Sequence, residues 1–261
     1  MDSNPKFVQS LNREPANFGF AIRGAPTLLA IETAGSACSA AVVRDGALLA
    51  SEYRALRHGH AEALFAMIER VMAEAGLAPS QLDAVAAAIG PGGFTGIRVG
   101  LAAAHGIALA VGARLVGISS FAAVAARVAG VVDRGCEMLL VALESRRADL
   151  YVQLFASDAT TPLAAPQALL PDCLAGHLAP FAGDGRVLIA GDAASAAAGA
   201  LGGRVRYAIA DDTAPDARGV CAAALRELGS GTSAGAVRPF YLRPPDVTLP
   251  KRPRPTPASQ R

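Results

Sequence analysis

The same pattern of apolar strands occurs at two places in this chain, and this repetition limits the folds that the chain can adopt. Residues 27–43 read TLLAIETAGSACSAAVV, and residues 138–155 read MLLVALESRRADLYVQLF. In each segment an apolar run ends on a glutamate, Glu32 or Glu144, and a second run returns after a short polar turn, as in a β-hairpin. Recurrence of one unit along a chain indicates duplication. We therefore expect two similar halves.

The residues after each hairpin predict alternating strands and helices. In the first half, Asp45-Gly46 marks a tight turn into a third strand. Later elements follow from apolar periodicity: a helix within 59–77, strands at 82–89 and 114–119, and helices at 97–111 and 119–129. This order is β-β-β-α-β-α-β-α. In the second half we expect strands at 186–191 and 204–210 and a helix over 213–228, with Thr213 as its cap and Pro215 in its first turn.

Two such halves with acidic residues at matching strand ends describe an α/β protein of the actin-like ATPase (ribonuclease H-like) fold, built from two duplicated βββαβα-type halves. We expect the chain to divide as follows: residues 1–26 as a flexible N-terminal extension, 27–130 as the first actin-like subdomain with the glycine turn and the partner helices, 131–243 as the second actin-like subdomain, and 244–261 as a disordered Pro-rich tail.

Composition argues against several functional classes. The 261 residues carry a formal net charge of only +2, so there is no broad basic surface for direct nucleic-acid binding. The four cysteines are scattered without a C-x-x-C pair, which predicts neither a zinc knuckle nor a disulfide framework and fits a reducing cytoplasm. Gly, Arg or His interrupts every apolar run before the roughly 20 residues that cross a bilayer, so no membrane association is expected.

The glycine-rich turn at residues 90–96 is a candidate anion or nucleotide loop. Gly92, Gly93 and Gly96 allow positive φ and close backbone approach, and Thr95 is a candidate cap or further donor, so N–H groups at the start of a helix could bind an anion. Arg98 in the first turn opposes the helix dipole, which makes sense if it pairs with a carboxylate or a phosphate. No G-K-[ST] follows, so this is no Walker A loop. The alternative is that the glycines only permit close packing.

Residues of the first hairpin belong to the same candidate loop. Actin-like ATPases place an acidic residue and small hydroxyl or glycine residues around Mg²⁺ and phosphate at this point, which corresponds to Glu32, Thr33 and Ser36. Glutamate is one methylene longer than the aspartate usual there, which argues against retained nucleotide chemistry. Hydrogen bonds that close a β-turn are the alternative role.

Several segments together resemble one bacterial family, TsaB (YeaZ). These segments are LLAIETAGSACSAAVV, HGHAEALFAMI, GPGGFTGIRVGLAAAHGIALA, VALESRRADLYV and RPFYLR. The resemblance covers about residues 27–243; it is specific at the first hairpin and the glycine turn and loose over 156–236. It implies a noncatalytic, cytoplasmic binding and activating subunit in the synthesis of N6-threonylcarbamoyladenosine (t6A) at position 37 of tRNA.

The resemblance also implies partners. The chain would dimerise with the TsaD transferase, a small ATPase, TsaE, would join the pair, and tRNA would be contacted only indirectly through the complex. A homodimer would form through the same helices when TsaD is absent. No cofactor is implied, apart from weak ATP or ADP binding in the complex.

The apolar helix at 97–111 predicts where a partner binds. Only Arg98 and His105 interrupt its apolar surface, so it needs a cover on two sides, either the neighbouring subdomain or another protein. Its small residues permit the close approach of a second helix, and the preceding helix adds a mixed surface. The expected partner-interface residues are Ala63, Met67, Arg70, Gly100, Ala103 and Ile107.

An enzyme of the same fold is the rival hypothesis, either an ATP-dependent kinase-like phosphotransferase or a glycoprotease-like metallopeptidase. The TsaD family carries an H-x-x-x-H metal pair after the strand that follows its glycine turn, whereas this chain reads VGISSFAAVAA there. His58 and His60 lie before the first helix, without an evident third ligand. No G-x-S-x-G nucleophile motif occurs either. We therefore expect no catalytic residue and no metal site.

Overall fold

A computed structural model describes residues 24–56, 59–132, 135–183, 185–210, 213–230 and 237–243. The expectation for the tail at 244–261 lies outside the described residues, as do those for His58 and for nearly all of the N-terminal extension.

Each half of the chain contains the same order of elements, as the repeated hairpin predicts. The first half consists of β1 (Leu28–Glu32), β2 (Ala37–Arg44), β3 (Ala47–Ala55), α1 (His60–Glu74), β4 (Ala84–Gly90), α2 (Phe94–Val111), β5 (Arg114–Ser119) and α3 (Ser120–Val132). The second half consists of β6 (Met138–Glu144), β7 (Leu150–Ala156), β8 (Gln167–Leu169), α4 (Leu174–Ala182), β9 (Arg186–Ala190), α5 (Ala194–Leu201), β10 (Arg206–Ile209) and α6 (Ala217–Gly229). Both halves therefore read β-β-β-α-β-α-β-α, although β8, α4 and α5 were not predicted individually.

The two halves also share one sheet topology. Each forms a five-stranded sheet, in the orders β3-β2-β1-β4-β5 and β8-β7-β6-β9-β10. In both sheets the first strand pairs antiparallel with the second and parallel with the fourth, so that Glu32 lies opposite Ser39 and Leu28 opposite Ala84. Identical strand order in two consecutive halves confirms the duplicated α/β fold.

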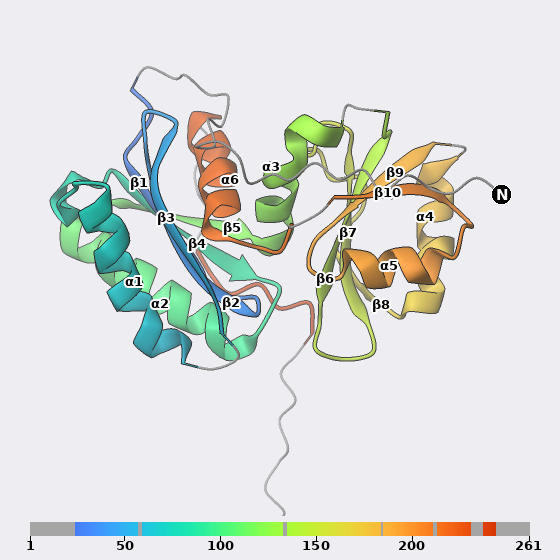
Figure 1. The fold of residues 1–261 in the computed structure, drawn as a ribbon, viewed down its shortest axis with the longest axis horizontal. Helices are drawn as coiled ribbons and strands as arrows, with labels where there is room; N and C mark the ends of the chain where they lie inside the picture. Colours follow the sequence, from blue (N-terminus) through green and yellow to red (C-terminus); the bar gives the residue numbers. More distant parts are fainter. Residues whose placement is uncertain are drawn as a thin grey trace, which may run out of the picture.

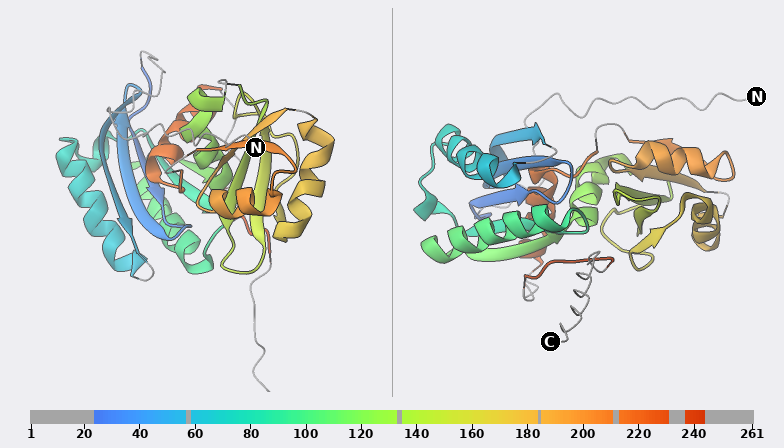
Figure 2. Two further views of the ribbon diagram at one scale, coloured as in Figure 1. Left: turned by 45° about the vertical axis from the view of Figure 1, so that its right-hand side comes forward. Right: turned by 90° about the horizontal axis from the view of Figure 1, so that it is seen from below.

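Helices cover both faces of each sheet. Helices α1 and α2 lie on the outer face of the first sheet, α4 and α5 lie on the outer face of the second, and α3 and α6 lie between the sheets (Figures 1 and 2). We call each sheet, with the helices on its outer face, a lobe. Alternate side chains of β6 point to opposite faces of the sheet: Leu140 packs in the outer core of the second lobe, whereas Leu139 and Val141 pack with α3 in the inner core. Such double coverage explains the continuous apolar runs of the central strands.

The third helices of the two halves pack across the middle of the molecule. Helix α3 packs its Phe121 and Val124 with strands of the second sheet, and α6 buries Val220 and Cys221 in the core of the first. A side chain at Gly219 would overlap the carbonyl oxygen of Ala123, so glycine is required for the close contact of α6 with α3. The core of the first sheet is therefore completed by residues far along the chain.

The cap predicted for α6 was wrong. The helix begins after Asp216, whose carboxylate accepts a hydrogen bond from the N–H of Gly219 at 2.8 Å. Thr213 instead accepts a hydrogen bond from the N–H of Gly191 at 2.8 Å through its hydroxyl, which ties the segment before α6 to the end of β9. Asp216 also pairs with Arg218 at 2.7 Å. An aspartate at the cap carries a negative charge that threonine lacks, and this charge strengthens the pairing with Arg218.

Candidate functional site

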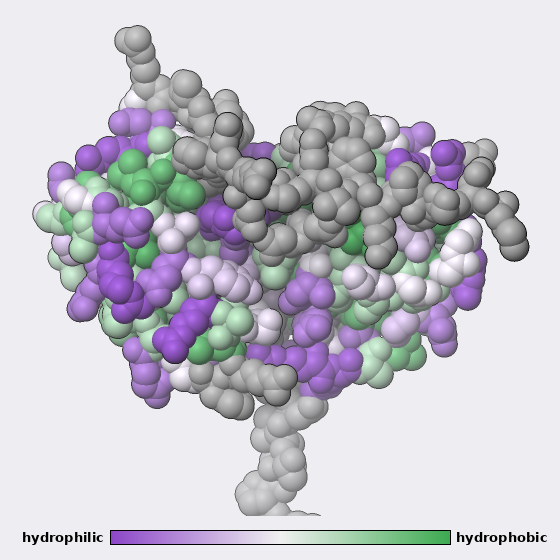
Figure 3. All heavy atoms as spheres, viewed as in Figure 1, coloured by the Kyte–Doolittle hydropathy of each residue, from purple (hydrophilic) through white to green (hydrophobic). Residues whose placement is uncertain are grey.

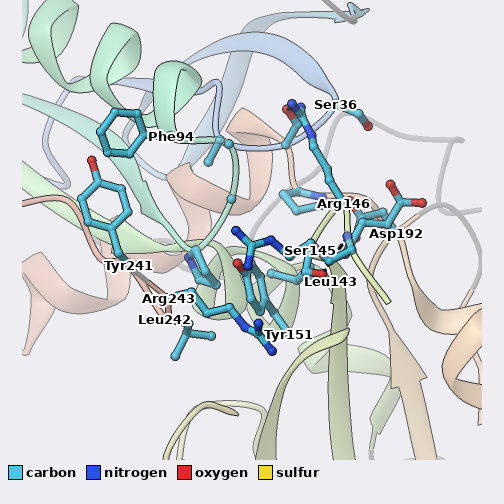
Figure 4. Close-up of a pocket in the computed structure, with 18 residues that line it drawn as sticks. Ser36, Phe94, Leu143, Ser145, Arg146, Tyr151, Asp192, Tyr241, Leu242 and Arg243 are labelled. Atoms are coloured by element: carbon cyan, nitrogen blue, oxygen red, sulfur yellow. Dashed lines mark hydrogen bonds between the residues drawn. The ribbon is translucent and has the colours of Figure 1, made fainter. Parts of the chain in front are cut away.

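A cavity of about 570 Å³ lies between the two lobes, where the first hairpin and the glycine turn face the hairpin of β6 and β7. Hydrophilic side chains gather between the lobes at the lower centre of the face seen in Figure 3. The cavity is lined by backbone of both turns and by a mixed set of side chains that includes Ser36, Phe94, Glu144, Ser145, Arg146, Arg147, Tyr151, Asp192, Tyr241 and Arg243 (Figure 4). Its position between duplicated lobes makes it the candidate ligand site.

The glycine turn is shaped by close packing. Gly92, Gly93 and Gly96 do not have positive φ, so that part of the prediction was wrong; Gly90, with φ 106°, is the residue of this turn in the left-handed region. A side chain at Gly92 would overlap the carbonyl oxygen of Ala34, and one at Gly96 would overlap that of Thr33. The glycines thus let α2 approach the first hairpin, whereas Gly93 has room for a Cβ.

The residues that begin α2 contact protein groups. Its N-cap is Gly93, so Thr95 is an exposed residue of the first turn and not the cap. The guanidinium of Arg98 lies 3.6 Å from the centre of the Phe94 ring, and its Nε donates a hydrogen bond to the hydroxyl of Tyr241 at 3.2 Å. A cation–π contact and a tyrosine, rather than a carboxylate or phosphate, therefore explain a cation at this end of the helix.

Glu32 and Thr33 are bound into the first hairpin. The Glu32 carboxylate is fully buried, and its Oε1 accepts hydrogen bonds from the N–H groups of Ala34 and Gly35. Thr33 donates its hydroxyl to the carbonyl of Gly96 at 2.8 Å, which links the hairpin to α2. Ser36, by contrast, lines the cavity. The geometry of Glu32 and Thr33 thus corresponds to the alternative role predicted above, in which hydrogen bonds close the turn.

Burial changes the protonation of two carboxyl groups near the cavity. Desolvation raises the pKa of Glu32 to about 7, against the opposing effect of its two backbone hydrogen bonds. Desolvation also raises the pKa of Asp192 to about 6, and the Asp192 carboxylate accepts a hydrogen bond from the N–H of Glu144 at 2.9 Å. Both carboxyl groups therefore retain a proton to higher pH than exposed carboxyl groups do.

The second lobe contributes the cationic groups of the cavity. Arg146, at the tip of the hairpin with φ 61°, extends toward the turn at 34–36, and its guanidinium lies 3.4 Å from the carbonyl oxygen of Gly35 (Figure 4). Arg243 pairs with the buried Asp149 at 3.1 Å. Sequence reasoning missed Tyr241 and Arg243 as cavity residues, because nothing local indicates that residues 241–243 return to the cavity.

The cavity carries arginines, hydroxyls and carboxylates but no grouped metal ligands. Among the described residues, no three His, Cys, Asp or Glu side chains lie close enough together to hold a metal ion. The cationic side chains of the cavity would suit an anion, and the carboxylates Glu144 and Asp192 at the same cavity would repel one.

The outer faces of α1 and α2 form a second candidate site. The structure corrects three of the residues predicted for a partner surface: Met67 has 0% exposure, and Gly100 and Ala103 are also buried, all facing the core of this chain. A Cβ at Gly100 would overlap the hydroxyl of Thr33, so this position faces the first hairpin. The periodicity of an apolar helix cannot tell its two sides apart, so the prediction chose the wrong side.

Other predicted residues remain at the surface. Ala63 and Ile107 are partly exposed, and Arg70 is exposed and held by the Glu52 carboxylate at 2.7 Å. The outer side of α2 instead presents Leu109, which is 87% exposed, with the exposed Ala102 and Ala110, and α1 presents Phe65, which is 56% exposed. We call these four residues the outer apolar face. By length and composition alone α2 could cross a membrane, but its inner side packs on the first sheet.

The fold and the cavity together define a class. Two β-β-β-α-β-α-β-α halves of identical strand order, with a cavity between them, make this chain a member of the actin-like ATPase fold. The family model described as TsaD, tRNA N6-adenosine threonylcarbamoyltransferase, matches residues 54–170.

Two sequence relatives and one solved structure are similar to the chain. The tRNA threonylcarbamoyladenosine biosynthesis proteins TsaB of Escherichia coli and Haemophilus influenzae are 30% and 34% identical to this chain, over 48% of the chain and 52% of each relative. A Pseudomonas aeruginosa structure, an uncharacterized protein with similarity to peptidase YEAZ, has a TM-score of 0.71 and 28% identity, covering 84% of this chain and 100% of its own. The chain is thus similar to TsaB (YeaZ) proteins, in sequence over about half of its length and in structure over most of it. The chain spans about half the length of the curated relatives it matches.

Proposed function

We propose that this protein is the binding and activating subunit of the complex that makes t6A in tRNA, and that it pairs with a TsaD-like transferase. By similarity to proteins named for t6A biosynthesis, it would act in the cytoplasm, be joined by a TsaE-like ATPase, and reach tRNA only through the complex. It would form a homodimer when the transferase is absent. ATP or ADP would bind weakly, and only in the complex. The chain itself would carry out no catalytic step.

The outer apolar face is the observation that carries this proposal. Leu109 and Phe65 lie on the adjacent helices α2 and α1. Leu109 is 87% exposed and Phe65 is 56% exposed. Burying a leucine or phenylalanine side chain contributes about 1.5–3 kcal/mol, so an exposed pair of this kind favours association. The neighbouring Ala102 and Ala110 are small and permit a partner helix to approach closely.

The architecture of the cavity supports a role other than catalysis. Glu32, at the position of the acidic residue of actin-like ATPases, is buried and bonded within its own turn, and Thr33 is bonded to Gly96. Arg98, the cation nearest the glycine turn on α2, is engaged by Phe94 and Tyr241. These contacts favour a turn that holds the hairpin against α2 over a turn that binds phosphate.

A binding experiment tests the proposal. The chain and the TsaD homologue of the same genome are mixed, and their Kd is measured by titration calorimetry for wild type, Leu109→Glu and Phe65→Glu. Leu163→Glu, on an exposed leucine of the second lobe, is the matched control. We expect each variant of the outer apolar face to weaken binding at least tenfold, because a buried unpaired carboxylate is costly, while the melting temperature stays within a few degrees of wild type.

Activity is tested in the same mixtures. The chain alone should form no t6A and cleave no glycoprotein. With the transferase, TsaE, ATP, threonylcarbamoyl-adenylate and tRNA, t6A formation should require the wild-type chain. Unchanged affinity in both Leu109→Glu and Phe65→Glu would place the interface elsewhere. Activity of the purified chain by itself would support the kinase-like or peptidase alternatives.

A further inference from the structure

The short segment 237–243 connects the two lobes. On the first lobe, the N–H of Phe240 donates a hydrogen bond to the carbonyl of Ile89 at 2.7 Å, which extends the end of β4. The ring of Tyr241 lies 5.3 Å from that of Phe94, at an angle of 30°, and Figure 4 shows the two rings side by side. The hydroxyl of Tyr241 also accepts the hydrogen bond from Arg98.

Two glycines of the first lobe make room for this segment. A Cβ at Gly90 would lie 2.6 Å from the carbonyl oxygen of Phe240, and one at Gly117 would lie 3.0 Å from a methyl carbon of Val237. Real side chains do not tolerate the first of these contacts. The surface of β4 and β5 therefore accommodates the segment because both positions lack side chains.

On the second lobe, the segment ends in an ion pair with a buried partner. Arg243 contacts Asp149, whose side chain is only 4% exposed, at 3.1 Å. Asp149 belongs to the hairpin that carries Arg146, and its own carbonyl accepts a hydrogen bond from the hydroxyl of Ser145 at 2.6 Å. Phe240 and Leu242 pack against the inner core cluster, which includes Phe121 and Tyr151. A buried carboxylate without its cation is costly, so the ion pair holds Arg243 at this point of the second lobe.

We propose that residues 237–243 act as an interlobe clamp, which sets the angle between the lobes and forms one wall of the cavity. The contacts of Phe240 and Tyr241 fix one end on the first lobe, and Arg243 fixes the other end on the second. Because Tyr241 contacts Phe94 and Arg98, the clamp also ties the lobe angle to the first turn of α2. The clamp depends only on these contacts and stands independently of the proposed function.

Distance measurements between the lobes test the clamp. Cys173 in the second lobe is exposed, whereas Cys38, Cys136 and Cys221 are buried, so one spin label goes on Cys173 and a second on Glu74→Cys in α1. Pulsed electron double resonance then gives the distribution of the interlobe distance. We expect one narrow distance in the otherwise wild-type chain, and a broader and shifted distribution in Arg243→Ala and in Tyr241→Ala.

Controls separate a clamp from general loosening. Arg206→Ala removes an exposed arginine of the second lobe and should leave the distribution unchanged, as should a chain that ends at Arg243. A chain that ends at residue 236 should show the broadest distribution. If that chain does not fold, the two point variants decide, each checked by circular dichroism. An unchanged distribution in folded Arg243→Ala and Tyr241→Ala would overturn the proposal.

Discussion

Replacing Glu32 by glutamine tests whether this buried carboxyl lowers the stability of the protein at neutral pH. The side chain is fully buried, and its Oε2 has no hydrogen-bond partner. Glutamine keeps the size of the side chain, and its carbonyl oxygen can still accept the hydrogen bonds from the N–H groups of Ala34 and Gly35. The substitution therefore removes the titrating charge and leaves the turn intact.

The magnitude follows from the pKa of Glu32. Below pH 4.5, the ordinary value, the carboxyl is protonated in both the folded and the unfolded chain. As the pH rises from 4.5 to about 7, the unfolded chain releases this proton while the folded chain retains it, so the free energy of unfolding falls. At about 1.4 kcal/mol for each pH unit, the loss approaches 3 kcal/mol by pH 8. Glu32→Gln lacks this loss.

Urea unfolding at a series of pH values measures the effect. We expect Glu32→Gln to match the wild type within about 1 kcal/mol at pH 4.5 and to be more stable by about 2–3 kcal/mol at pH 8. Asp192, whose pKa is raised in the same direction, is present in both proteins, so its contribution largely cancels in the difference. Glu74→Gln, on the exposed side of α1, is the control and should show no such trend. A difference between Glu32→Gln and wild type that stays constant from pH 4.5 to 8 would refute the reasoning.

Further predictions concern packing, the cap of α6 and metal content. Gly96→Ala should destabilise the protein by about 1–3 kcal/mol, because the added Cβ would overlap the carbonyl of Thr33. Gly106→Ala lies on the same helix where space is open, so thermal melts should show it to be neutral or stabilising by up to about 1 kcal/mol. Asp216→Ala should cost about 3 kcal/mol or more, because it removes a helix cap and a buried carboxylate, and Asp216→Asn should cost less; a reversed order in urea unfolding would contradict the role of the cap. The purified chain should keep its melting temperature in a chelator, and one zinc or iron ion per chain that resists the chelator would contradict the absence of grouped ligands among the described residues.

The sequence by itself determined the duplicated fold and the strands that carry the site. Apolar runs and turn residues are local signals, so the hairpins at residues 27–54 and 138–155 and the strands that follow them were predicted from the sequence. The start of α2 at Phe94, three residues earlier than expected, shows that the glycine turn conceals a helix boundary. The short elements β8, α4 and α5 lack a strong period, and the sequence did not reveal them.

The orientation of each apolar helix was decided by tertiary structure alone. Helix α2 is apolar on both sides, so its sequence gives no preference between Ala103, which packs on the sheet, and Leu109, which faces outward. The same holds for the positions of α6 and of residues 237–243, which cross to the first lobe over long sequence separations. Hydrophobic burial is proportional to area and has no direction of its own, so the choice of face and partner depends on which surfaces the folded chain brings together.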